Sequence, residues 1–291
     1  MHVLKSLVPS TLSQFFKPEI DTRVGRRLQY SLNPKLILNQ RRRFGKFTAA
    51  TIVSSIMEGV VPESTEQVRY VSPNCTEIIV IRHGETEWNA EGRIQGHLDV
   101  ELNDMGRQQA HAVANRLSKE PKISAVYSSD LKRAFETAET IAQLCGGLVV
   151  VKDPSLRERH LGEIQGLLYS DVSVTNDKAY QAMVSRQTDR IIPGGGESLD
   201  QLYERCTSSL ERIAENHRGE RVVVVSHGGT IRALHRRASS NGRCGKISNA
   251  SVNIIHLSED GQWTIKVWGD VSHLGDAGFL KSGFGGDQNS G

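Results

Sequence analysis

Hydrophobic residues along the chain group into short apolar runs that alternate with longer stretches of helical periodicity. The runs at Glu77–Ile81 (EIIVI) and Arg221–Val225 (RVVVV) are the clearest. Uninterrupted β-branched runs of this length are typical of strands buried on both faces of a parallel sheet. Weaker runs predict two more strands, and two alternating segments around Asp260-Gly261 predict a β-hairpin. These four segments are 123–127, 148–151, 252–257 and 263–267.

Segments with helical spacing separate these strands. In the segment 198–216, for example, Leu202, Cys206, Leu210 and Ile213 fall on one helical face. Helices are predicted at 102–118, 130–144, 198–216 and 229–237. Because strands and helices alternate along the chain, the sequence predicts an α/β fold. We expect a three-layer α/β/α sandwich around a mostly parallel central sheet.

The net charge of +3 for the 291 residues hides a strong asymmetry. Residues 1–57 contain ten Lys and Arg but only two acids, which gives this segment +8 and leaves −5 for the rest. The body therefore gives no reason to expect nucleic acid as a partner. No run of roughly 18 apolar residues is present, so no membrane span or membrane partner is expected. The four cysteines lack CxxC spacing, which argues against a disulfide framework or a thiolate zinc site.

The basic segment 1–57 also contains ten Ser and Thr. An Arg-rich, Ser-rich and acid-poor composition is typical of an organelle transit peptide, and the location would then be the chloroplast or the mitochondrion. The alternatives are a disordered basic tail, or an extension that Met57 bypasses as an internal start; the protein would then be cytoplasmic. The expected organisation is an N-terminal extension over 1–57, disordered in this prediction, a linker over 58–75 and one domain over 76–291.

Candidate chemistry sits where the two clearest strands end. The first strand leads into Arg82-His83-Gly84, and the second leads into Ser226-His227-Gly228. Ligands of open α/β sheets bind outside the carboxyl ends of the strands, so the two histidines could face one site. A neutral imidazole can attack phosphorus and hold the phosphoryl group covalently. Arginine offsets the charge of phosphoryl oxygens and matches their geometry. This combination favours phosphoryl transfer through a phosphohistidine.

The sequence RHGETEWN at 82–89 resembles the signature of the histidine phosphatase superfamily, in its phosphoglycerate mutase-like branch. The resemblance spans about residues 76–290 and includes further motifs. These are GRIQG at 92–96, SSDLKRA at 128–134, LRERHLG at 156–162, PGGGES at 193–198 and SHGG at 226–229. RHG alone would be a weak signal, but the full motif at a strand end, with the others in order, is a specific one.

The resemblance implies a role for each residue that matches the family pattern. His83 would be the nucleophile, and Arg82 and Arg133 would clamp the phosphoryl oxygens. His227 would stabilise the phosphoryl group, and Glu158 would protonate the leaving oxygen and then take a proton from water. Substrate-binding roles are expected for five further residues: Asn89, Gln95, Gly96, Gly228 and Glu85. For Glu85, the alternative is a packing or hydrogen-bonding role. No metal and no cofactor is expected.

The expected reaction is hydrolysis of a small anionic phosphorylated metabolite in carbohydrate or serine metabolism, with a homodimer compatible with the sequence. The alternative is a phosphoglycerate mutase, which by resemblance needs a longer covering segment than the 69 residues from Glu158 to His227. Two further alternatives are a non-catalytic regulator on this fold and a phosphatase that acts on macromolecules. The Gly194–Ser198 loop is expected either to contact the non-phosphate end of the substrate or to cap a helix.

Overall fold

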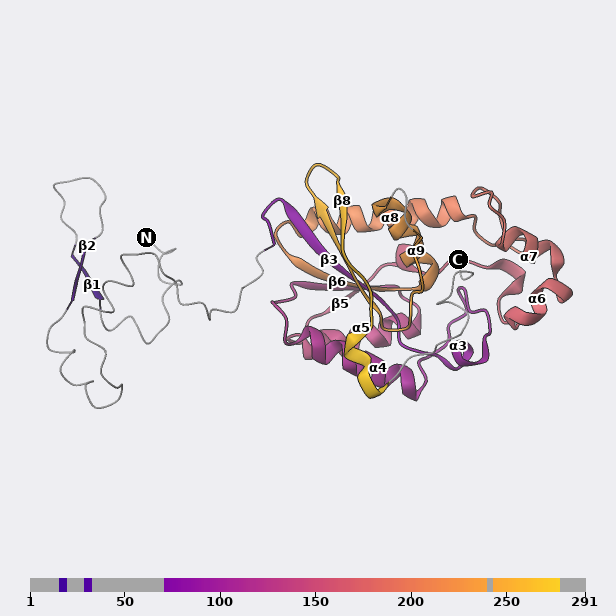
Figure 1. Cartoon of the computed structure of the whole chain (residues 1–291), viewed down its shortest axis with the longest axis horizontal. Coiled ribbons are helices and arrows are strands. Elements are labelled where there is room, and N and C mark those ends of the chain that lie inside the picture. Colours follow the sequence, from indigo (N-terminus) through magenta and orange to yellow (C-terminus); the bar gives the residue numbers. More distant parts are fainter. Residues whose placement is uncertain (1–15, 20–28, 33–70, 240–242, 278–291) are drawn as a thin grey trace. The chain divides into compact units, whose positions relative to one another are not determined.

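The computed structural model describes residues 16–19, 29–32, 71–239 and 243–277 (Figure 1). The chain divides into two units, Met1–Gln67 and Val68–Gly291. In the first unit, β1 (Phe16–Glu19) and β2 (Gln29–Leu32) pair antiparallel. The expectations for the rest of 1–57, for most of the linker and for the tail beyond 277 lie outside the described residues.

The second unit is built on a six-stranded sheet with the order β5-β4-β6-β3-β7-β8. The strands are β3 (Cys75–Arg82), β4 (Ala125–Ser128), β5 (Val150–Lys152), β6 (Arg221–Ser226), β7 (Val252–Ser258) and β8 (Trp263–Asp270). The first four in the order are parallel, β7 is antiparallel to β3, and β8 is antiparallel to β7. All six predicted strands therefore form, and the predicted hairpin is β7–β8.

Helices cover both faces of this sheet, which confirms the three-layer architecture (Figure 1). Alternation along β3 explains the two layers, because successive side chains of a strand point to opposite faces. Ile78 and Val80 pack with residues of α8 and α9, whereas Ile79 and Ile81 pack with residues of α4 and α5. All four side chains are fully buried. The covering helices are α4 (Asp104–Leu117), α5 (Lys132–Leu144), α8 (Leu199–Asn216) and α9 (Gly228–Ala238).

Several short elements have no counterpart in the sequence prediction. Three are helices, α3 (Glu87–Glu91), α6 (Tyr169–Thr175) and α7 (Asp177–Met183). Three are 3-10 helices, η2 (Pro154–Leu156), η3 (Gly162–Ile164) and η4 (Ser272–Ala277). Buried residues around α6, α7 and η3 form a third, smaller apolar cluster. Figure 1 shows α3, α6 and α7 at the end of the sheet where β3 and β6 finish.

The parallel register of the central strands fixes the position of the candidate site. Arg82, the last residue of β3, lies opposite Ser226, the last residue of β6. Ser128 at the end of β4 lies opposite Val225. Three strand ends therefore share one edge of the sheet, and the loops that follow them meet there.

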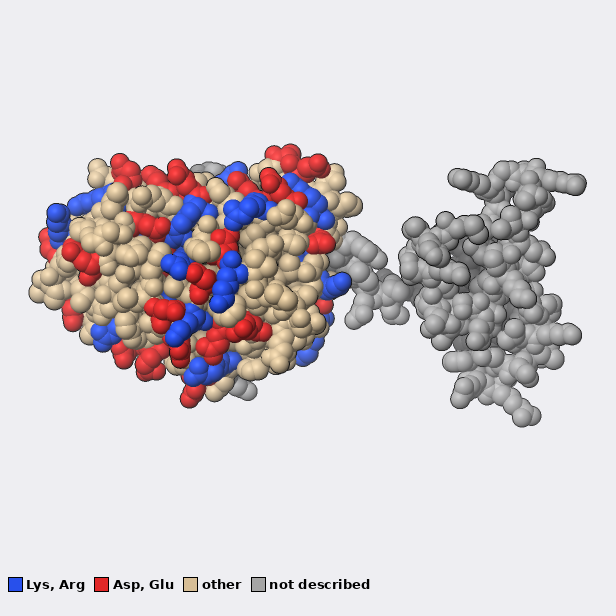
Figure 2. All heavy atoms as spheres, turned by 180° about the vertical axis from the view of Figure 1, so that it is seen from behind, with Lys and Arg blue, Asp and Glu red and all other residues tan. Residues whose placement is uncertain are grey.

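Charged side chains of both signs lie on the face of this unit that Figure 2 shows. Lys and Arg side chains are intermixed with Asp and Glu over the face in Figure 2, without an extended area of one sign on that face. Within the described ranges, no helix has both the length and the apolar character to cross a membrane.

Candidate active site

The rings of His83 and His227 meet at the carboxyl edge of the sheet. Their centroids are 5.1 Å apart and their planes are inclined by 57°. His83 is 3% exposed and His227 is fully buried. Although 144 positions separate them in the sequence, β3 and β6 are neighbours in the sheet, so the residues that follow both strands are brought together. The structure thus places the two histidines of the two His-Gly pairs in one site.

The backbone sets the proton position on the His83 ring. Its Nδ1 lies 2.6 Å from the carbonyl oxygen of Gly84. A carbonyl oxygen only accepts, so Nδ1 carries the proton and Nε2 keeps its lone pair. Burial, followed by the charges of Arg133 and Arg82, holds the pKa of His83 well below its usual value. A neutral imidazole with a lone pair on Nε2 is the form that can attack phosphorus.

His227 is the N-terminal cap residue of α9, and its ring lies beside His83. Neither of its ring nitrogens has a hydrogen-bond partner within the described part of the chain. Burial lowers its pKa, and the charge of Arg133 acts in the same direction. Buried polar groups without partners are rare in native structures. Such a group directly after the end of a strand indicates a binding site in which a ligand supplies the missing hydrogen bonds.

The two predicted arginines are buried beside the histidines, Arg82 at 2% and Arg133 at 1% exposure. Arg82 donates from Nη1 to the carbonyl of Ile247 at 2.7 Å. Arg133 donates from Nη2 to Gly96 at 2.7 Å and from Nη1 to the carbonyl of Leu98 at 2.9 Å. Burial lowers the pKa of Arg133 to about 10, against the opposing effect of Glu158. Although Arg133 lies in the first turn of α5, its side chain is therefore buried in the site and not solvated on the helix surface.

Glu158 reaches the same site from the loop that follows η2. Its Oε1 accepts the backbone N–H of Arg159 at 2.8 Å, and its Oε2 accepts that of Gly229 at 3.1 Å. The carboxyl group therefore lies at the first turn of α9, next to the His227-Gly228 peptide. Glu158 therefore places a carboxyl group beside the histidine pair, where a general acid that protonates the leaving group must lie.

The second group of predicted residues is partly engaged in supporting structure. Asn89 accepts from the backbone N–H of Thr86 at 3.2 Å and closes the capping box of α3. Glu85 accepts from the side chain of Asn103 at 2.9 Å, which supports its hydrogen-bonding alternative. Gln95 is 6% exposed, and its Oε1 has no partner among the described residues. Gly96 presents its carbonyl to Arg133.

Two glycine-containing segments have structural roles next to the site. At Gly84, an added Cβ would lie 2.4 Å from the carbonyl oxygen of Gly106, so the residue is small because α4 packs against it. In the Gly194–Ser198 loop, Ser198 and Gln201 form a capping box at the start of α8. The capped-helix alternative is therefore confirmed.

Three residues that the sequence analysis did not assign to the site also support it. His97 and Arg205 both donate to the carbonyl of Glu158, at 2.6 and 2.7 Å. Asn249 donates to the carbonyls of His83 and Gly84, at 3.1 and 3.3 Å. None of the three lies at the end of a strand, and none matches a motif position to which the family resemblance assigns a role. Only their position in the fold brings them to the site.

Two neutral imidazoles, two guanidinium groups and a carboxyl group thus converge on one edge of the sheet. The cations and His227 suit a bound phosphoryl group, His83 can bond to phosphorus, and Glu158 can move the proton. In the described part of the chain, no cluster of three or more His, Cys, Asp or Glu side chains is arranged to hold a metal ion. The fold and the site define an α/β phosphoryl-transfer enzyme with histidine as the candidate nucleophile.

Comparison with known proteins identifies the family. The model of the histidine phosphatase superfamily (branch 1) matches residues 78–271, and the chain belongs to this superfamily. Phosphoglycerate mutase-like protein 4 of Arabidopsis thaliana is 64% identical over 229 residues, which cover 78% of this chain and 100% of that protein. Metal-independent phosphoserine phosphatase of the same plant is 52% identical, with 75% and 91% covered.

A solved mycobacterial structure, glucosyl-3-phosphoglycerate phosphatase, is similar in fold with a TM-score of 0.58. It shares 32% identity, and the match covers 67% of this chain and 99% of that one. Together with the family membership, these phosphatases identify the chain as a phosphoric monoester hydrolase.

Proposed function

We propose that this protein hydrolyses small phosphomonoesters through a phosphohistidine formed on His83. The observation that carries the proposal is the buried His83–His227 pair, with the Nε2 lone pair of His83 kept available by the Nδ1 hydrogen bond to Gly84. Arg82 and Arg133 supply the positive charge that a bound phosphoryl group needs.

The first step forms the phosphoenzyme. The lone pair on Nε2 of His83 attacks phosphorus, and the bond between phosphorus and the ester oxygen breaks. The electron pair leaves on that oxygen, which takes a proton from the protonated Glu158 and departs as an alcohol. His227 and the two arginines hold the phosphoryl oxygens while charge builds on them.

The second step discharges the phosphoenzyme. Glu158, now a carboxylate, takes a proton from water as the water oxygen attacks phosphorus. The phosphorus–nitrogen bond breaks and its electron pair returns to Nε2 of His83. Inorganic phosphate leaves, and the protonated Glu158 is ready for the next turnover.

Hydrolysis is favoured over isomerisation because a mutase must exclude water while its substrate reorients. The 69 residues from Glu158 to His227 form η3, α6, α7, α8 and β6, without a longer covering insertion. The names of two relatives, phosphoserine phosphatase and glucosyl-3-phosphoglycerate phosphatase, favour a small anionic metabolite such as phosphoserine or a sugar or glycerate phosphate. Mutase activity is the second candidate, because another relative is named mutase-like.

The test is a screen of the full chain against phosphoserine, sugar phosphates and phosphoglycerates, with and without EDTA. We expect release of phosphate that EDTA does not abolish. Rapid quench with the labelled best substrate should trap acid-labile label in the wild type and none in His83→Ala. Full turnover by His83→Ala would contradict the covalent mechanism. Interconversion of 3- and 2-phosphoglycerate at a rate comparable to hydrolysis would favour the mutase.

A further inference from the structure

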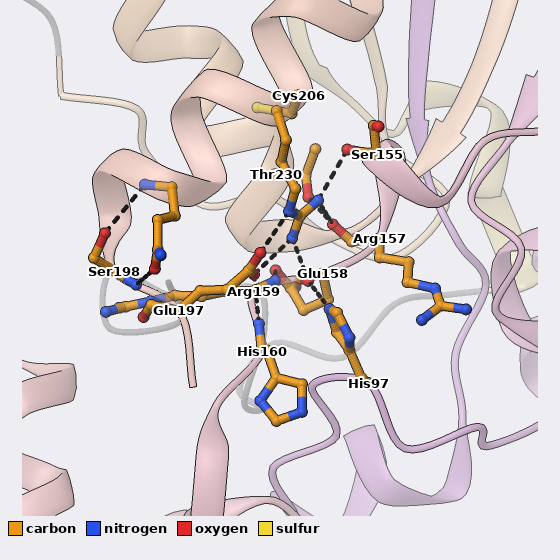
Figure 3. A network of polar contacts seen from close by, with 12 residues as sticks. His97, Ser155, Arg157, Glu158, Arg159, His160, Glu197, Ser198, Cys206 and Thr230 are labelled. Carbon is orange, nitrogen blue, oxygen red and sulfur yellow. Dashed lines mark hydrogen bonds and ion pairs between the residues drawn. The ribbon is translucent and has the colours of Figure 1, made fainter. Parts of the chain in front are cut away.

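A single arginine of α8 forms hydrogen bonds to several carbonyls of the loop that carries Glu158. Arg205 donates to the carbonyls of Ser155 at 2.9 Å, Arg157 at 2.8 Å and Glu158 at 2.7 Å. Figure 3 shows these contacts as dashed lines that converge between the loop and the helix. Three carbonyls within four residues are thus fixed to one side chain. A loop held in this way cannot turn without breaking several hydrogen bonds at once.

Glu197 holds the same guanidinium from the other side. It accepts from Nε of Arg205 at 2.7 Å and from Nη2 at 2.8 Å, which is the two-pronged geometry of a strong pair. Its Oε2 also accepts the backbone N–H of His160 at 2.8 Å. The five hydrogen bonds of Arg205 use as many N–H groups as a guanidinium has. The Arg205 side chain is therefore oriented completely by these partners.

The hydrogen bonds of Arg205 fix the peptide groups on both sides of Glu158. The carbonyl of Arg157 also accepts from Thr230 at 2.7 Å, and the carbonyl of Glu158 also accepts from His97 at 2.6 Å. The direction of a side chain follows from the orientation of the peptides that flank it. Because both flanking carbonyls are shared with Arg205, this residue controls where the carboxyl group of Glu158 points.

Arg205 is held on a long, capped helix. This helix has 18 residues and begins at the Ser198 capping box, one residue after Glu197. The Arg205 and Glu197 side chains are each 20% exposed, so the pair is largely removed from water. No hydrogen bond described for Arg205 goes to His83, His227 or the two clamp arginines. Its hydrogen bonds therefore reach the chemistry through the Glu158 loop, while its charge is a lesser cause of the lowered pKa of His227, which Arg205→Lys would preserve.

We propose that Arg205, held by Glu197, is the positioning residue that aims Glu158 at the leaving oxygen. This inference rests on the proposed function, in which Glu158 protonates that oxygen. It has a specific consequence. An alkoxide is a poor leaving group and needs the proton, whereas nitrophenolate is a good leaving group and departs without it. Misplacing Glu158 should therefore slow the cleavage of alkyl esters much more than that of aryl esters.

The experiment compares kcat/KM for the best alkyl phosphomonoester of the panel and for p-nitrophenyl phosphate, in full-length variants. For Arg205→Gln and Glu197→Gln we expect a loss of about 100-fold on the alkyl ester and a much smaller loss on the aryl ester. Arg205→Lys keeps the positive charge but loses the planar, two-pronged guanidinium. It should retain more activity on the alkyl ester than Arg205→Gln does. The matched control is Arg212→Gln on the same helix. It removes a half-exposed guanidinium that pairs with Asp153, and should leave kcat/KM for both substrates unchanged.

A double-mutant cycle makes the test sharper. If Arg205 acts through Glu158, then Arg205→Gln added to Glu158→Gln should cost little more on the alkyl ester than Glu158→Gln alone. Equal losses on both substrates, or additive losses in the cycle, would overturn the positioning role. If Arg205→Gln does not fold, Arg205→Lys and Glu197→Gln carry the same comparison. A wild type without phosphatase activity would instead overturn the proposed function, and with it the premise.

Discussion

The free protein keeps two imidazoles uncharged at its candidate site. His83 and His227 are buried next to two arginines, and both burial and those cations lower their pKa values. A nucleophilic imidazole must be unprotonated, so this environment prepares His83 for attack on a bound phosphoryl group. The same environment costs stability whenever the solution favours the protonated form, because the folded state cannot accept the proton easily.

This cost leads to a prediction on pH and stability. An unfolded histidine has a pKa of about 6.5, so below that pH the unfolded chain binds protons that folded His227 does not. The free energy of unfolding should therefore fall as the pH drops from 7 to 5, by up to about 1.4 kcal/mol per pH unit for each such histidine. His227→Asn should show a shallower fall in urea titrations. His111→Asn, at an exposed position of α4, is the matched control for the substitution. Parallel slopes for His227→Asn and the wild type would contradict the prediction.

At the scale of elements, one ionic cluster joins the three central strands. Glu77 of β3 lies in register with Arg221 of β6 on one side and with His256 of β7 on the other. Its carboxylate contacts Arg221 at 2.5 Å and His256 at 2.9 Å. Burial alone would raise the pKa of Glu77, but hydrogen bonds from His256 and Arg221 lower it to about 2. The cluster thus stabilises the strand order that brings His83 and His227 together.

Glu77→Gln should destabilise the fold at neutral pH. A shift of the pKa from the usual Glu value of about 4.3 to about 2 corresponds to at most about 3 kcal/mol at pH 7, and screening by solvent around this partly exposed carboxylate reduces the figure. Because the pKa is lowered by folding, this contribution is present above the unfolded pKa and is lost as the pH falls toward 2. The difference in unfolding free energy between Glu77→Gln and the wild type should therefore shrink between pH 5 and pH 3. A constant difference over that range would show that the loss comes from packing.

The elements that the sequence predicts well are those with strong local patterns. The apolar runs of β3 and β6 and the amphipathic spacing of α8 were sufficient, because burial on two faces or one face leaves a period in the sequence. The short helices α3, α6 and α7 were not predicted. With five or seven residues each, they show no period, and their stability comes from tertiary packing such as the small cluster around α6 and α7.

The site shows the same division. His83 and His227 could be predicted because each directly follows a strand, and Glu158 and Arg133 because contiguous motifs surround them. Asn249 and Arg205 could not, since their roles depend on contacts made only in the folded chain. Asn249 reaches the carbonyl of His83 across 166 sequence positions, and no local pattern records such a contact. Sequence motifs thus identify the reacting groups, and the fold identifies what orients them.

At the scale of the whole molecule, the candidate site belongs to one of the two units of the chain. The match to the histidine phosphatase superfamily covers residues 78–271, which lie within the unit Val68–Gly291. The hydrogen bonds described for His83, Arg133 and Glu158 all have partners in that unit. The basic segment 1–57, proposed as a targeting segment, lies in the unit Met1–Gln67.

Removal of residues 1–67 should therefore leave the chemistry unchanged. We expect the shortened protein to keep the kcat, the KM and the melting temperature of the full chain, because the sheet, its covering helices and all five candidate catalytic groups remain. Steady-state kinetics and thermal unfolding of the two proteins, prepared side by side, provide the measurement. Full-length His83→Ala sets the baseline for a site without its nucleophile. A shortened protein with kinetics close to that baseline but an unchanged melting temperature would show that the first unit contributes to the site, and the assignment of the catalytic machinery to one unit would be wrong.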